Sequence, residues 1–150
     1  MKIAVSACLL GVPCRFDGRS KPSSEVIEYL EREGHEVVRV CPEVMGGLSI
    51  PHPPSELQAT PEGLRVVDCE GADNTEAFAR GAQKACAVAQ SAGCTHALLK
   101  AKSPSCGVGC VYDGTFSKTL VSGNGVAAQL FIEAGFTVAT EETFQSVFKA

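Results

Sequence analysis

Hydrophobic and polar positions along the chain alternate between the period of a strand and the period of a helix. Short apolar runs rich in β-branched residues predict strands over 2–8, 37–41, 64–69, 95–99 and 136–139, the last at a sheet edge. Apolar residues at helical spacing predict helices over 23–34, 74–92, 125–133 and 142–148. Strands that alternate with helices favour an α/β fold, a three-layer sandwich with a mainly parallel, Rossmann-like doubly wound sheet.

Two segments break this alternation. Residues 42–61 hold five of the eight prolines, too many for a central strand or a long helix, and predict an ordered loop over a site. Residues 102–119 are rich in Gly, Ser and Cys and predict a second loop. There is no internal repeat or linker, so we expect residues 1–150 to form one domain.

The composition indicates that the cysteines of this chain are free thiols and not disulfides. The chain has 150 residues and 45% hydrophobic positions, enough for a core without disulfides. Its eight cysteines, about 5%, fall below the density of roughly 8–10% typical of disulfide scaffolds. The first residues do not resemble a signal peptide, so we expect a cytoplasmic protein whose cysteines bind metal or catalyse.

Charge and hydropathy bear on the partners. The net charge of −4 argues against a nucleic-acid partner, and no run of about 18 apolar residues suggests a membrane span. We expect a small-molecule partner and leave open whether the chain forms a homodimer. No Walker-type phosphate loop or complete dinucleotide fingerprint is present, so a nucleotide cofactor is unsupported.

Ligands of parallel α/β sheets bind beyond the carboxyl ends of the strands, and this rule sorts the cysteines. Cys8 and Cys41 end the first two predicted strands, and Cys106 lies in the loop after the 95–99 strand. We therefore expect these three thiols at one edge of the sheet. Cys14 and Cys110 fall near this edge in loops. Cys86 and Cys94 are expected to pack in the core, and the position of Cys69 is left undecided.

Polar groups accompany the three cysteines. Glu43 follows Cys41 with only Pro42 between them, and the proline-rich loop would shield its carboxylate for proton transfer. Ser103 and Ser105 place two hydroxyls beside Cys106, and the glycines that follow allow backbone amides to approach a ligand or inorganic sulfide.

Four segments together resemble the thiouracil desulfidase family, long known only as a bacterial domain of unknown function. They are Ser6-Ala7-Cys8-Leu9-Leu10-Gly11 with Cys14-Arg15-Phe16-Asp17-Gly18, Cys41-Pro42-Glu43 with Gly46-Gly47-Leu48, Pro51-His52-Pro53-Pro54-Ser55-Glu56, and Leu98-Leu99-Lys100 with Ser103-Pro104-Ser105-Cys106-Gly107. The resemblance covers nearly the whole chain. The family pattern differs at two positions, with Tyr in place of Phe16 and Arg in place of His52.

The resemblance implies an enzyme that removes sulfur from a thiolated pyrimidine without net redox change, a hydrolase or lyase acting on a C=S bond. It implies a [4Fe-4S] cluster held by Cys8, Cys41 and Cys106, with one iron left open to take the sulfur before it leaves as hydrogen sulfide. Glu43 and Ser103, rather than Ser105, would be catalytic. We assign four further residues to substrate binding: Ser105, His52, Gly46 and Gly47.

Two other interpretations remain open at this point. A closed zinc or cluster site without catalysis would use Cys110 as a fourth ligand beside the three cysteines. A thiol redox or persulfide-carrying protein would use Cys106 and Cys110, which are spaced CxxxC.

Overall fold

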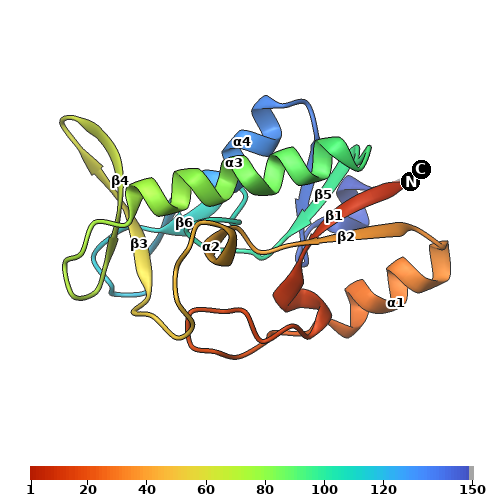
Figure 1. Ribbon diagram of the computed structural model, residues 1–150, viewed down its shortest axis with the longest axis horizontal. Coiled ribbons are helices and arrows are strands. Elements are labelled where there is room, and N and C mark those ends of the chain that lie inside the picture. The colour runs from red at the N-terminus through yellow and green to blue at the C-terminus, as the bar shows by residue number, and fades with distance from the viewer. Residues whose placement is uncertain (149–150) are drawn as a thin grey trace.

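A central sheet of parallel strands organises the computed structural model, which describes residues 1–148 (Figure 1). The strand order is β2-β1-β5-β8, and every neighbouring pair is parallel. The strands are β1 (Lys2–Ser6), β2 (Glu36–Val40), β5 (His96–Leu99) and β8 (Thr137–Thr140). The predicted edge strand is therefore β8. The expected domain runs to Ala150, but residues 149–150 lie outside the described part of the chain.

Helices cover both faces of this sheet. Successive residues of β1 point to opposite sides, so that Ile3 and Val5 enter one core cluster while Ala4 enters the other. Two helices pack on the first side, α1 (Ser24–Glu33) and α5 (Phe144–Val147), and two on the second, α3 (Thr75–Ser91) and α4 (Val126–Glu133). The predicted three-layer α/β sandwich is confirmed.

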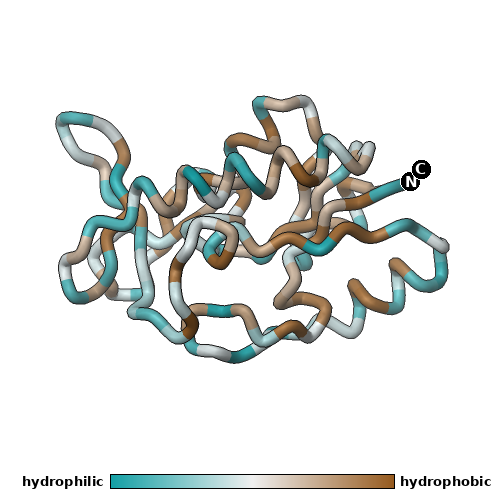
Figure 2. Tube along the Cα trace, in the orientation of Figure 1, coloured by the Kyte–Doolittle hydropathy of each residue, from teal (hydrophilic) through white to brown (hydrophobic). Residues whose placement is uncertain are grey.

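The hydropathy of each element fits its position. The strands of the sheet are mostly apolar, whereas α1 alternates between apolar and polar residues as an amphipathic surface helix does (Figure 2). Among residues 1–148 no helix is both long and apolar enough to cross a membrane.

Two antiparallel hairpins lie outside the central sheet. They are β3 (Ser55–Thr60) with β4 (Gly63–Asp68), and β6 (Cys110–Tyr112) with β7 (Leu120–Ser122). The strand expected at 64–69 thus forms, but it pairs with β3. In Figure 1 the β3–β4 hairpin projects at the end of the molecule opposite the two termini.

Both segments expected to be loops contain regular structure. Residues 42–61 include the short helix α2 (Pro42–Met45) and strand β3, and residues 102–119 include β6. Proline is favoured at the first position of a helix, which is where Pro42 stands, and β3 begins directly after Pro54. The prolines of this segment therefore mark the starts of α2 and β3 and do not prevent these elements from forming.

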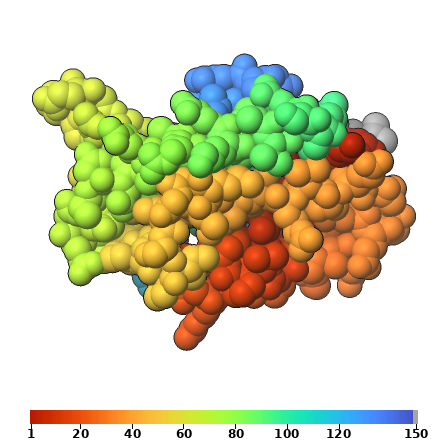
Figure 3. Space-filling view, viewed as in Figure 1, coloured from red at the N-terminus to blue at the C-terminus, as the bar shows by residue number. Residues whose placement is uncertain are grey.

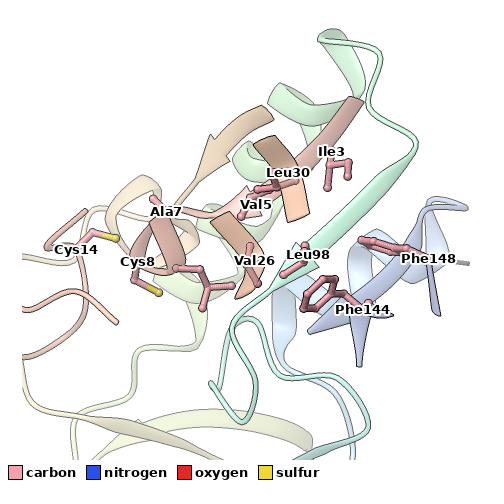
Figure 4. Close-up of a cluster of buried hydrophobic side chains, with 12 residues drawn as sticks. Ile3, Val5, Ala7, Cys8, Cys14, Val26, Leu30, Leu98, Phe144 and Phe148 are labelled. Carbon is pink, nitrogen blue, oxygen red and sulfur yellow. The ribbon is translucent and has the colours of Figure 1, made fainter. Parts of the chain in front are cut away.

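The first strand is shorter than expected. β1 ends at Ser6, and the chain continues as a 3-10 turn, η1 (Ala7–Leu10), that ends at Gly11 with a φ of 95°. Cys8 consequently lies in a tight turn just beyond the strand. The core cluster beneath α1 reaches this turn: Figure 4 shows Cys8 and Cys14 at one end of the cluster and Phe148 toward the other.

Candidate functional site

A cavity of about 830 Å³ opens at the carboxyl edge of the central sheet. Cys8 reaches it from the turn after β1, Cys41 from the end of β2, and Cys106 from the loop after β5. The structure thus brings together the three thiols that the edge rule selected. Glu43 and Ser103 line the same cavity, so five of the nine proposed site residues meet there.

Two of these thiols are almost completely buried. Cys8 is 8% exposed and Cys106 is 5% exposed. Burial raises the pKa of Cys8 to about 11, with a smaller contribution from the charge of Cys41. Burial likewise raises the pKa of Cys106 to about 12. Both groups hold their protons at neutral pH, and binding of a metal would replace those protons.

Cys41 differs because a second cysteine contacts it. A hydrogen bond between the side chains of Cys14 and Cys41 lowers the pKa of Cys41 to about 7, and the backbone amides of Glu43 and Val44 act in the same direction. The same bond, together with burial, raises the pKa of Cys14. The Cys41 Sγ also lies 3.6 Å from the Cys14 carbonyl oxygen. Cys14 is thus a fourth thiol of the cavity.

Glu43 is held by a histidine. The Nε2 atom of His52 lies 3.0 Å from Oε1 of Glu43, and Nδ1 lies 2.7 Å from the Ser49 carbonyl oxygen. The hydrogen bond to Glu43 raises the pKa of His52, and the bond to Ser49 adds to this effect. Glu43 lines the cavity and His52 does not.

Ser103 organises the loop after β5. Its Oγ accepts hydrogen bonds from the backbone amides of Ser105 and Cys106, each at 3.1 Å. A hydroxyl has two acceptor positions and one donor. Because both acceptor positions are used, Ser103 offers the cavity its O–H, which can donate to a bound oxygen, nitrogen or sulfur atom.

Comparison with known proteins identifies the family. Residues 3–143 match the 2-thiouracil desulfurase family. The chain belongs to this family.

Two relatives of this chain match it over almost its full length. A solved structure named [4Fe-4S]-dependent thiouracil desulfidase TudS is 41% identical, with a TM-score of 0.86 over 98% of this chain and 95% of that one. A Bacillus subtilis (strain 168) protein, named uncharacterized protein YbbK, is 36% identical over 97% of this chain and 99% of its own length. The resemblance inferred from the motifs is confirmed.

The four residues assigned to substrate binding do not line the cavity. Gly46 packs on α3, where its carbonyl accepts from the Arg80 guanidinium at 2.8 Å, and Gly47 follows it with a φ of 92°. Ser105 is 1% exposed, and its Oγ has no hydrogen-bond partner among the described residues. His52 lies behind Glu43. The substrate-binding role of these four residues remains a prediction, and their positions outside the cavity wall do not support it.

The cavity also contains charged residues that the sequence did not assign to the site. Lys100 directly follows β5 and pairs with Glu141 at 2.8 Å, with their side chains 20% and 16% exposed. The Ala101 amide donates to the same carboxylate at 2.7 Å. Applying the edge rule to the last strand would have found Glu141, because it directly follows β8.

A loop between β6 and β7 also reaches the cavity. Phe116 and Lys118 line it, and both have positive φ values, 59° and 61°. Glu56 fixes this loop by accepting from the amides of Gly114 at 2.9 Å and Phe116 at 3.1 Å. Phe and Lys residues with left-handed backbone carry no sequence signal, so this part of the cavity could not be predicted from the sequence.

The remaining cysteines divide between core and surface. Cys86 and Cys94 are buried in the cluster beneath α3, as expected. Cys69 is exposed at the cavity rim. Cys110 lies on β6 outside the cavity lining, which does not favour the closed four-ligand site.

Proposed function

We propose that this protein hydrolyses the C=S bond of thiouracil to give uracil and hydrogen sulfide, using a [4Fe-4S] cluster held by Cys8, Cys41 and Cys106. The observation that carries the proposal is the meeting of three thiols with the carboxylate of Glu43 in one cavity. Membership of the 2-thiouracil desulfurase family and the similarity to a protein named as a [4Fe-4S]-dependent thiouracil desulfidase support it.

The donor set fits an iron–sulfur cluster. Cys thiolates are the usual ligands of such clusters, and the three come from separate segments around one cavity. Among residues 1–148 no three His, Cys, Asp or Glu side chains gather closely enough to hold a single metal ion. When bound, a cluster held by three cysteines supplies an iron with an open position, a Lewis acid toward sulfur.

Glu43 supplies the proton transfer. In the overall reaction the oxygen of one water replaces the sulfur at carbon, and both protons of that water leave with the sulfide. No electrons are gained or lost. Glu43 takes a proton from the attacking water and returns it to the departing sulfur, which needs a carboxylate that faces the cavity and stays partly shielded.

Ser103 polarises the substrate. Because its Oγ already accepts two backbone hydrogen bonds, only its O–H remains for the ligand. A donor at this position stabilises negative charge that develops on the pyrimidine when water attacks the adjacent carbon. The same two backbone bonds hold the segment that carries Cys106, so Ser103 links the ligand loop to the substrate.

Cluster assembly and turnover test this proposal. Anaerobically reconstituted protein should contain iron and sulfide in equal amounts, with the absorption of a [4Fe-4S] cluster, and should release uracil and sulfide from 2-thiouracil or 4-thiouracil. Cys8→Ala, Cys41→Ala and Cys106→Ala should each lose the cluster, whereas the core variant Cys86→Ala should keep it. A full cluster in any of the first three variants contradicts the ligand assignment.

The role of Glu43 needs a separate comparison. Glu43→Ala should retain the cluster and lower kcat by about 100- to 10,000-fold, the range of general acid–base catalysis. Glu25→Ala removes an exposed carboxylate from the first turn of α1 and should leave turnover unchanged. Wild-type turnover by cluster-containing Glu43→Ala would exclude Glu43 from proton transfer.

A further inference from the structure

His52 is fixed from several directions. Its backbone N–H donates to the Phe16 carbonyl oxygen at 2.8 Å, and its ring meets the Phe16 ring edge-on with the centroids 6.5 Å apart. Its side chain is only 7% exposed. The segments that carry His52 and Phe16 meet on one face of the molecule (Figure 3). The ring thus has little freedom to move.

The hydrogen bonds of the ring decide where its protons lie. Nδ1 faces the Ser49 carbonyl oxygen, which can only accept, so Nδ1 carries a hydrogen. Nε2 lies 3.0 Å from Oε1 of Glu43. A hydrogen bond at this distance needs a hydrogen on one of these two atoms, because a lone pair on Nε2 cannot bond to a lone pair on Oε1. One proton therefore lies between Nε2 and Oε1. If the ring turned, neither nitrogen would keep its present partner, Ser49 for Nδ1 and Glu43 for Nε2.

This arrangement gives the two oxygens of Glu43 different tasks. Oε1 is engaged by His52. Within residues 1–148, Oε2 has no hydrogen-bond partner, while the Glu43 side chain lines the cavity. Oε2 is consequently the oxygen available to exchange a proton with a bound molecule.

We propose that His52 is a positioning residue for Glu43: it anchors Oε1 to the Ser49 carbonyl through the imidazole ring and so directs Oε2 into the cavity. This inference rests on the proposed role of Glu43 in desulfuration. His52 touches neither the cavity nor a bound molecule and acts through the carboxylate. We propose this positioning role for His52 in place of the substrate-binding role expected from the sequence.

The orientation matters because a glutamate side chain is flexible. Without the anchor, the carboxylate rotates among several rotamers, most of which place Oε2 away from the reacting atoms. Misplacing a catalytic group by about 1 Å can reduce a rate by about 100-fold. The loss should fall on kcat, since the pocket that binds the pyrimidine is unchanged.

Two amide variants separate anchoring from simple packing. The Gln side-chain nitrogen occupies nearly the position of Nε2 in histidine, so His52→Gln keeps the donor to Glu43. The Asn nitrogen mimics Nδ1, so His52→Asn keeps only the bond to Ser49. With holoenzyme of equal cluster content, His52→Asn should lower kcat by about 100-fold at unchanged KM, and His52→Gln should stay within about tenfold of wild type.

Two further measurements complete the test. In a Glu43→Ala background, His52→Asn should cause no additional loss, because the residue it orients is absent. Crystal structures of the holoenzymes should show the Glu43 carboxylate ordered as here in His52→Gln, and in several rotamers or a new one in His52→Asn. This second readout needs no turnover.

The outcomes are distinguishable. Wild-type kcat in His52→Asn, losses that multiply in the double variant, or an unmoved Glu43 carboxylate in the His52→Asn crystal would each overturn the positioning role. Absence of turnover in wild-type holoenzyme would overturn the proposed function instead, and the crystallographic comparison would still decide whether His52 orients Glu43.

Discussion

A glycine contact between α2 and α3 controls where Glu43 stands. A Cβ atom on Gly81 of α3 would lie 1.8 Å from the Pro42 carbonyl oxygen and 2.9 Å from the Gly46 amide nitrogen. Real Cβ contacts are essentially never shorter than 3.0 Å. Gly81→Ala must therefore push α2 away from α3 by about 1.2 Å or distort both helices.

The cost of this substitution has two opposing parts. Alanine is a better helix former than glycine by about 1 kcal/mol in a helix interior. Overpacking of a well-packed contact costs about 1–3 kcal/mol, and here a rigid backbone oxygen is the obstacle. Because a rigid obstacle favours the upper part of that range, about 2–3 kcal/mol, we expect a net loss of about 1–2 kcal/mol. Such a loss lowers Tm by about 2–4 °C per kcal/mol for a chain of this size.

Activity should suffer more than stability. The new methyl group would clash with the carbonyl oxygen of Pro42, which lies between Cys41 and Glu43. A shift of Pro42 by about 1 Å would therefore move both of these residues. We expect kcat to fall by about 100-fold. Turnover and thermal unfolding of reconstituted Gly81→Ala protein measure the two effects, with Gln83→Ala, on the exposed side of the same helix, as the control. Wild-type Tm together with wild-type kcat in Gly81→Ala would refute the reasoning.

Three other predictions follow from the cavity. Lys100→Met leaves the Glu141 carboxylate without its cationic partner, with the Ala101 amide as its remaining donor, and should lower the free energy of unfolding by about 2 kcal/mol in denaturant titrations. The double variant Lys100→Met with Glu141→Leu should recover part of this loss. Glu56→Ala frees the 113–119 loop and should raise KM about tenfold with kcat within about twofold. In cluster-free protein at pH 7, iodoacetamide should alkylate Cys41 before Cys8 and Cys106, because the Cys41 pKa of about 7 leaves half of that thiol as thiolate. Equal alkylation rates of the three thiols, measured by mass spectrometry, would contradict this.

The sheet and the meeting of the three thiols at one edge could be predicted from the sequence because parallel strands obey a simple rule. Cys8 and Cys41 follow strands that pair directly, and Cys106 follows the strand on the other side of β1. Once the hydrophobic runs are located, the carboxyl edge places all three thiols without any knowledge of side-chain contacts. The burial of Cys86 on α3 followed from helical periodicity, and that of Cys94 followed from its position before β5, at the opposite edge of the sheet.

Contacts between loops could not be predicted in this way. The proline-rich segment was expected to cover the site, but its contribution is to bring His52 against Glu43 and to place β3 beside the loop that Glu56 holds. Each of these contacts joins residues whose separation depends on turn geometry. Neither periodicity nor composition records that geometry.

The two kinds of site residue therefore depend on different parts of the fold. The three thiols follow strands of one sheet, and its two central strands, β1 and β5, are almost completely buried, so a single surface change does not move them. Glu43 stands on a helix of four residues, too short to hold its own position, and depends on the glycine contact with α3 and on the histidine behind it. Substitutions at Gly81 or His52 should therefore separate cluster binding from catalysis, leaving a protein that carries its cofactor and fails to transfer protons.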